Sequence, residues 1–134
     1  MLAGVDAAQA ISDLTEISPQ VRHVALIGAD GSVTGSNLSD ATAAERLAAG
    51  AKRLVDEARA VREDMAQLEV ATLAGSVFVV RDGERMIAAT TTPEPTVGLV
   101  FYDLKTCLRS VEEPKKPAAR KRAPAKKAAD DAAS

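Results

Sequence analysis

The chain has 134 residues, which is enough for one modest hydrophobic core and a tail. Its net charge of −2 hides two parts of opposite sign: residues 1–111 carry 10 basic and 15 acidic side chains, whereas residues 112–134 carry 7 and 4. We therefore expect one domain over residues 1–111 and a disordered, basic Ala/Lys/Pro-rich tail over residues 112–134. The single cysteine cannot form an intramolecular disulfide, and no apolar run reaches the roughly 20 residues that span a bilayer. We expect a cytoplasmic protein with no membrane span.

A short helix and a hairpin come first. Apolar residues recur at helical spacing within residues 4–17, namely Ala7, Ile11, Leu14 and Ile17. Pro19 prevents that helix from continuing. Residues 21–28 then form a strand whose centre is apolar without a break, which indicates cover on both faces. Asp30-Gly31 is a hairpin turn signal, and residues 32–38 form the more polar returning strand, which we place nearer to a sheet edge.

The longest predicted element is an amphipathic helix over residues 42–65. It opens with Thr42 and Glu45 at the spacing of a capping box, in which both side chains satisfy free backbone N–H groups. Six apolar residues form a predicted core-facing stripe: Leu47, Ala51, Leu54, Ala58, Val61 and Met65. The whole apolar arc spans about 140°, more than the about 100° that one sheet needs. We expect its extra shoulder of Ala44, Ala48 and Val55 to contact a second chain.

After residue 65 the spacing of the apolar residues changes from that of a helix to that of strands. Three strands are predicted, over residues 68–73, 76–81 and 85–92. Ala74-Gly75 is the turn between the first two, and Asp82-Gly83 is a second hairpin turn signal, between the last two. After a loop with two prolines, a last helix follows over residues 99–111. The element order is therefore helix, two strands, helix, three strands, helix. We expect an α+β fold, in which a five-stranded antiparallel sheet carries one helix on one face and two on the other, with the strand order left open.

Residue counts exclude most catalytic and metal-binding arrangements. His23 is the only histidine and Cys107 the only cysteine, and they are far apart in sequence. A zinc site or a Cys–His nucleophile is therefore not expected. The glycines between residues 28 and 35 lack the Gly-Lys-Ser/Thr ending of a phosphate loop, and hairpin geometry accounts for them. We expect no catalytic residue, no cofactor and no metal.

Two sets of basic residues have open binding roles. Four arginines on the long helix could act in trans on a nucleotide hydrolase, although surface ion pairs are the more ordinary role: Arg46, Arg53, Arg59 and Arg62. The tail carries seven more: Lys115, Lys116, Arg120, Lys121, Arg122, Lys126 and Lys127. This block either makes weak, nonspecific, salt-sensitive contact with nucleic acid or another polyanion, or solubilises the chain and folds back on its acidic body. No aromatic residue is interleaved for base stacking, so sequence-specific recognition is not expected.

Several segments resemble the roadblock family, which comprises dynein light chains and bacterial small-GTPase regulators. Residues 24–33 look like the first hairpin of that family, and the apolar pattern of residues 68–99 is similar to its last three strands and final helix. The resemblance covers about residues 4–111 and rests on apolar positions and glycines. It implies a profilin-like fold. It also implies a homodimer or heterodimer, in which the third strands of two chains pair and the central helices lie together.

The implied dimer agrees with the strand over residues 68–73, whose edge would otherwise carry unpaired backbone groups. We expect six residues at the interface: Ala44, Ala48, Val55, Leu68, Val70 and Thr72. Bacterial family members are associated with small Ras-like GTPases, so the resemblance implies a non-enzymatic regulator or scaffold of such a GTPase. The alternatives are a structural subunit of a larger assembly with no effect on nucleotide turnover, a nucleic-acid accessory protein driven by the tail, and a small-molecule sensor. The few aromatic residues argue against the sensor.

Overall fold

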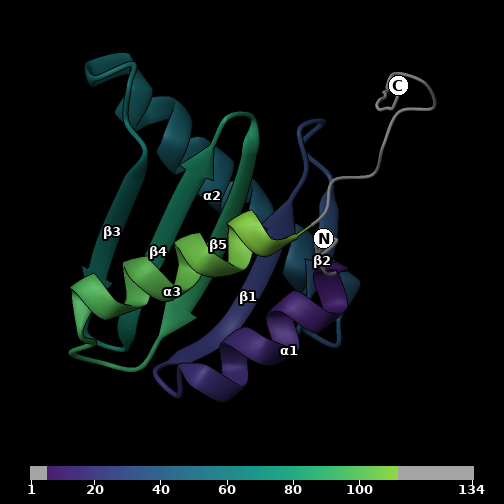
Figure 1. The fold of residues 1–134 in the computed structure, drawn as a ribbon. Helices are drawn as coiled ribbons and strands as arrows, with labels where there is room; N and C mark the ends of the chain where they lie inside the picture. Colours follow the sequence, from purple (N-terminus) through teal and green to yellow (C-terminus); the bar gives the residue numbers. More distant parts are fainter. Residues whose placement is uncertain (1–5, 112–134) are drawn as a thin grey trace, which may run out of the picture.

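Five strands form one antiparallel sheet in the computed structural model, which describes residues 6–111. They are β1 (Val21–Ile27), β2 (Val33–Ser36), β3 (Gln67–Thr72), β4 (Gly75–Asp82) and β5 (Arg85–Thr91). Their order across the sheet is β2-β1-β5-β4-β3, so β2 and β3 are its two edges (Figure 1). The helices are α1 (Ala7–Ile17), α2 (Ala41–Val61) and α3 (Val97–Ser110). The predicted element order and α+β class are confirmed.

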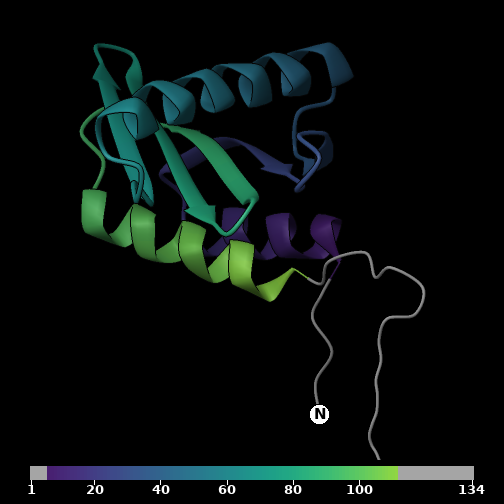
Figure 2. The ribbon, with the colours of Figure 1, turned by 90° about the horizontal axis from the view of Figure 1, so that it is seen from above.

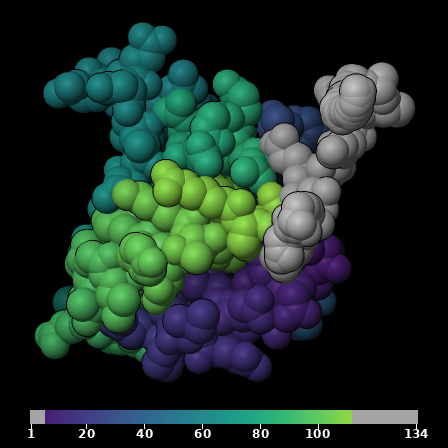
Figure 3. All heavy atoms as spheres, viewed as in Figure 1, coloured from purple at the N-terminus to yellow at the C-terminus, as the bar shows by residue number. Residues whose placement is uncertain are grey.

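The sheet separates two helical layers, which Figure 2 shows edge-on. α2 crosses one face alone, and α1 and α3 lie side by side on the other, as the space-filling view in Figure 3 also shows. Residues of β1 alternate between the two layers, so that Leu26 packs under α1 and α3 whereas Ile27 packs under α2. The apolar centre of β1 is therefore buried from both sides, as predicted.

Both predicted Asp-Gly turns are present. Gly31 joins β1 to β2 with a φ of +87°, and Gly83 joins β4 to β5 with a φ of +65°. Glycine adopts such left-handed angles without the steric cost that a Cβ atom brings. Asp30 stabilises the first turn, because its Oδ1 accepts hydrogen bonds from the backbone N and the Oγ of Ser32 at 3.0 and 2.7 Å. These bonds lower the pKa of Asp30.

The predicted capping box of α2 is wrong. The helix begins earlier, with Asp40 as its cap: the Asp40 carboxylate accepts from the backbone N of Thr42 at 3.0 Å. Thr42 is therefore already inside the helix. The helix also ends earlier than predicted, at Val61, because Arg62 takes an extended backbone conformation while its N–H closes the last turn on the Ala58 carbonyl at 2.9 Å.

The buried face of α2 lies to one side of the predicted stripe. Its buried residues are Ala44, Ala48, Ala51 and Val55. Leu47 and Leu54 are only half-buried, and Val61 is 81% exposed. Small side chains allow the helix to lie close to the strands, so the alanine-rich line packs inward and the larger leucines lie at its flank. In α1, Ile17 is likewise 68% exposed rather than part of the core.

Candidate interaction surface

The edge strand β3 has a free side. It pairs with β4 along its whole length, from Gln67 opposite Val80 to Thr72 opposite Gly75, and it is the last strand of the described sheet. In an antiparallel pair, alternate residues direct their N–H and C=O groups away from the partner strand. These groups are available to another strand, as in any open sheet edge.

Three predicted interface residues of β3 lie on the same face of the sheet. Leu68 and Val70 stand opposite Val79 and Val77 of β4, which pack in the layer under α2, and Thr72 continues the same alternation. Leu68 is half-buried, Val70 is 38% exposed and Thr72 is exposed. The strand therefore offers a partly apolar row on the α2 side.

The other three predicted interface residues are buried within the single chain. Ala44, Ala48 and Val55 are 4%, 5% and 3% exposed, because they form the line by which α2 packs on the sheet. They leave almost no surface for a second chain. Of the α2 residues predicted for the core, Leu47, Leu54 and Val61 keep accessible surface, whereas Ala51 is buried.

An apolar flank instead runs along one side of α2 and onto β3. We define it by five residues: Leu47, Leu54, Val61, Leu68 and Val70. The three helix residues are seven apart and so lie on one side of α2. Leu47, Leu54 and Leu68 each pack against the buried cluster beneath α2 while keeping part of their surface exposed.

The opposite side of α2 borders a hollow of about 230 Å³, with the turns after β1 and β4 forming its other walls. Of the four arginines on or just after α2, only Arg59 lines it. Arg46 and Arg53 are exposed, and Arg62 lies 3.6 Å from Asp64. Arg59 is half-buried, and its Nε has no hydrogen-bond partner. Burial, which sequence spacing does not reveal, distinguishes Arg59 from the others.

The candidate catalytic residues do not form a site. His23 is exposed on β1, with its Nδ1 3.3 Å from Thr90 Oγ1. The Cys107 thiol is buried in α3 and donates to the Ala10 carbonyl at 3.5 Å. Burial, with a smaller contribution from the charge of Asp13, raises the pKa of Cys107 to about 11. A thiol with so high a pKa is a poor nucleophile at neutral pH.

Within residues 6–111, no group of three or more His, Cys, Asp or Glu side chains is placed to hold a metal ion. No helix in that range is both long and apolar enough to cross a membrane. The seven basic residues of the predicted polyanion-binding tail lie outside the described residues.

The fold has clear relatives. The Roadblock/LC7 domain matches residues 7–92, from α1 through β5. A Roadblock/LC7 domain from Streptomyces avermitilis superposes with a TM-score of 0.72 at 21% identity, covering 79% of this chain and 94% of that one. MglB from Myxococcus xanthus gives 0.61 at 16% identity, covering 78% and 89%.

The architecture is also profilin-like. LokiProfilin1, solved in complex with rabbit actin, superposes with a TM-score of 0.55 at 12% identity, covering 75% of this chain and 91% of that one. A comparison with curated proteins finds no match. Because the matched domain spans more than half of the sequence, this chain belongs to the Roadblock/LC7 family.

Proposed function

We propose that the protein is a dimeric, non-enzymatic regulator or scaffold of a small Ras-like GTPase, which it binds through its sheet and helix surface. The observation that carries this proposal is the free edge of β3 next to the apolar flank of α2. Roadblock/LC7 domains are generally non-catalytic regulatory or scaffold domains. MglB, one of the structural neighbours, has also been solved in a tetrameric arrangement.

Two copies pair along β3 in this proposal, about a two-fold axis perpendicular to the sheet. An axis at Val70 places Leu68 of each copy opposite Thr72 of the other, and Glu69 opposite Ala71. An axis at Glu69 would instead set two carboxylates directly opposite each other, which destabilises a strand pair. We therefore favour the register centred on Val70, in which the contact is self-complementary.

This pairing brings the two α2 helices onto the same face of one continuous sheet. The exposed surface of Leu47, Leu54 and Val61 then becomes the helical part of the interface. Ala44, Ala48 and Val55 support the interface from below by fixing α2 to its own sheet. The proposed contact residues on β3 are those that the sequence predicted, whereas those on α2 are different.

The dimer is tested by light scattering on the full chain over a concentration series. Val70 and Val97 are both 38% exposed, so Val70→Lys and Val97→Lys are matched variants. We expect Val70→Lys to give the monomer mass, because two lysines would meet at the two-fold axis. Val97→Lys, at the start of α3, should keep the dimer mass. A Val70→Lys protein that stays dimeric at the lowest concentration would refute this interface.

Regulation requires that the dimer bind one nucleotide state of the GTPase more tightly than the other, since equal affinity shifts no equilibrium. The test titrates small Ras-like GTPases from the same cell, loaded with GDP or with a non-hydrolysable GTP analogue, into the dimer in a calorimeter. Unequal affinities support a regulator. Equal affinities support the scaffold alone, and no binding in either state contradicts the proposed partner class.

A further inference from the structure

The side chain of Arg59 makes no hydrogen bond or ion pair with any residue between 6 and 111. It is nevertheless half-buried at the C-terminal end of α2, and its Nε is fully enclosed. A guanidinium carries five N–H donors in a planar fork, and a buried donor without an acceptor is destabilising. The side chain is therefore positioned for an acceptor that the single chain does not supply.

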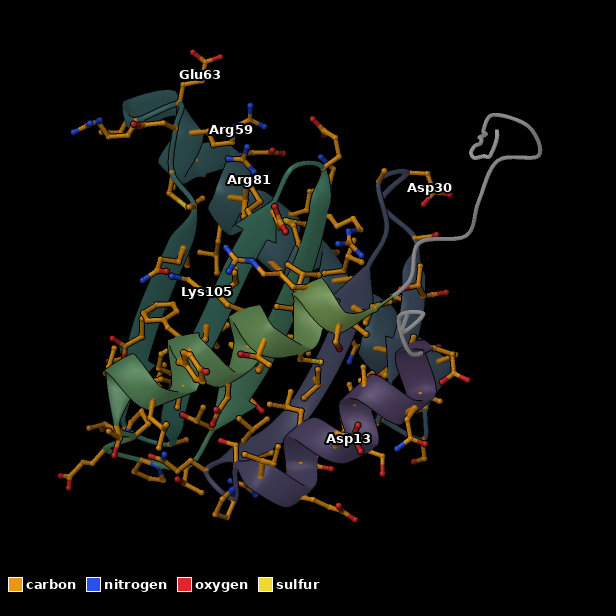
Figure 4. The ribbon with its side chains drawn as sticks, in the orientation of Figure 1. Asp13, Asp30, Arg59, Glu63, Arg81 and Lys105 are labelled. Atoms are coloured by element: carbon orange, nitrogen blue, oxygen red, sulfur yellow. The ribbon has the colours of Figure 1, made fainter. Side chains whose placement is uncertain are left out.

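Arg81, on β4, lines the same hollow, and Figure 4 shows both arginines at this end of the sheet. Its guanidinium is held by neutral groups: Nη1 donates to the Met65 carbonyl at 2.6 Å, and Nε donates to the Gly83 carbonyl at 3.4 Å. No carboxylate of the described chain pairs with Arg81. Both guanidinium groups thus border one open hollow, which Lys52 also lines, and that of Arg81 is held by two hydrogen bonds.

The carboxylates that line the hollow are mostly engaged. Asp30 already accepts two hydrogen bonds from Ser32. Asp56 pairs with Lys52, with 3.5 Å between Nζ and Oδ2. Glu84 is exposed and is the one lining carboxylate without a partner among residues 6–111. Neither arginine therefore forms an ion pair within residues 6–111, and Glu84 is the side chain that could compete for them.

We propose that Arg59 and Arg81 hold the carboxylate of an Asp or Glu side chain from a protein partner. A guanidinium fork matches a planar carboxylate, with two parallel N–H···O bonds. The volume of about 230 Å³ is smaller than that of a typical small-molecule pocket, so one side chain fits better than a whole ligand. The three carboxylates in the walls disfavour a doubly charged phosphate group more than a single carboxylate.

The site is independent of the proposed dimer. Lys52, Asp56 and Arg59 lie on the side of α2 opposite the apolar flank, by their spacing along the helix. A second copy docked on β3 therefore leaves the hollow open. Failure of the Val70→Lys test would overturn the dimer and would not affect the carboxylate site.

The experiment uses the full chain labelled with ¹⁵N and follows the Nε–Hε signals of its arginines by NMR. The probe is a tetra-glutamate peptide with blocked ends, and the control peptide is blocked tetra-glutamine. We expect the glutamate peptide to shift the Arg59 and Arg81 signals saturably and the glutamine peptide to shift neither. Inorganic phosphate at equal ionic strength should shift them less than the glutamate peptide does.

Matched variants separate a site from general charge attraction. Arg59→Gln should weaken peptide binding roughly tenfold, because a charged hydrogen-bonded pair is lost. Arg53→Gln, the same charge change on the exposed face of α2, should weaken it by about twofold at most. Arg59→Lys keeps the charge without the planar fork and should bind nearly as weakly as Arg59→Gln. Glu84→Gln removes the competing carboxylate and should strengthen binding by roughly twofold.

Equal weakening by Arg53→Gln and Arg59→Gln would overturn the proposal, because it would mean that only net charge matters. Phosphate shifts as large as those from the peptide would also overturn it, in favour of a free-anion site. The amide spectrum of each variant shows whether it is folded. If Arg59→Gln does not fold, the peptide affinity of Arg59→Lys, which keeps the charge, still tests the need for a guanidinium.

Discussion

The ring of Phe101 in α3 meets the ring of Phe78 in β4 edge to face, with centroids 4.9 Å apart and planes at 73°. Phe78 is fully buried, whereas Phe101 is half-buried at the side of α3. The Roadblock/LC7 match ends at residue 92, so this contact attaches a helix that lies beyond the matched segment. It adds to the packing of Val100, Leu104 and Leu108, which are buried between α3 and the sheet.

Replacing Phe78 by leucine should therefore destabilise the fold. The variant loses the ring contact and leaves a cavity, so we expect the free energy of unfolding to fall by about 1–3 kcal/mol. Tyr102→Leu is the control, because Tyr102 is 67% exposed on the same helix and its loss should change stability by less than about 0.5 kcal/mol. Urea denaturation measures both, and equal losses would argue against the anchoring role.

The cap of α2 gives a second prediction. Asp40→Ala removes the carboxylate that accepts from Thr42 N, so the free energy of unfolding should fall by about 1 kcal/mol. Thr42→Ala should leave stability within about 0.5 kcal/mol, since alanine suits a helix interior and Thr42 is not the cap. The midpoint temperatures of the two variants in thermal denaturation show which residue caps α2. A larger loss of stability in Thr42→Ala than in Asp40→Ala would support the capping box instead.

Element order and type could be predicted because local signals agree with the fold. The Asp-Gly pairs need the positive φ angles of Gly31 and Gly83, and Pro19 follows the end of α1 closely. The sheet order could not be predicted, because hairpins specify only neighbouring strands. The pairing of β1 with β5 joins residues 59 or more positions apart in sequence, from Ile27 opposite Met86 to Val21 opposite Thr91, and no local pattern encodes it.

The candidate surfaces were harder to predict than the fold. Leu47 and Ala48 are adjacent in sequence, and both belong to the wide apolar arc of α2. Only the packing of α2 on the sheet determines that Ala48 is buried and Leu47 is half-buried. The α2 cap was missed for a related reason, since Asp40 and Thr42 are both good capping residues. The spacing of the four arginines along the sequence does not distinguish Arg59 from the others. Its Nε becomes enclosed only when the chain folds.

The buried thiol makes stability depend on pH in the alkaline range. Burial raises the pKa of Cys107 from 9.0 to about 11, so the folded state disfavours the thiolate. This contribution is fully present below pH 9 and is lost as pH rises through 11, by roughly 3 kcal/mol at about 1.4 kcal/mol per pKa unit. Cys107→Ala should lose less stability than wild type between these two pH values. The free energy of unfolding of both proteins is measured by chemical denaturation across this pH range. An equal fall in wild type and Cys107→Ala would contradict the prediction.

The basic tail should add a salt-sensitive affinity for polyanions. Residues 112–134 carry seven Lys and Arg side chains, so we expect the full chain to be retained on immobilised duplex DNA at low salt and released steeply as salt rises. A chain of residues 1–113 should elute early at every salt concentration. Equal retention of both chains would show that the tail does not contribute to polyanion binding.

The open edge of β3 also has a consequence for solubility. Glu69 is the only charged side chain in β3, and the next residues along the chain, Leu73 and Ala74, are exposed and apolar. A charge within an apolar edge strand acts against fibril-like stacking of identical strands. Without Glu69, an uncharged stretch would run from Met65 to Val80 and include the apolar centre of β4. One carboxylate thus acts against the use of this open edge as a template for aggregation.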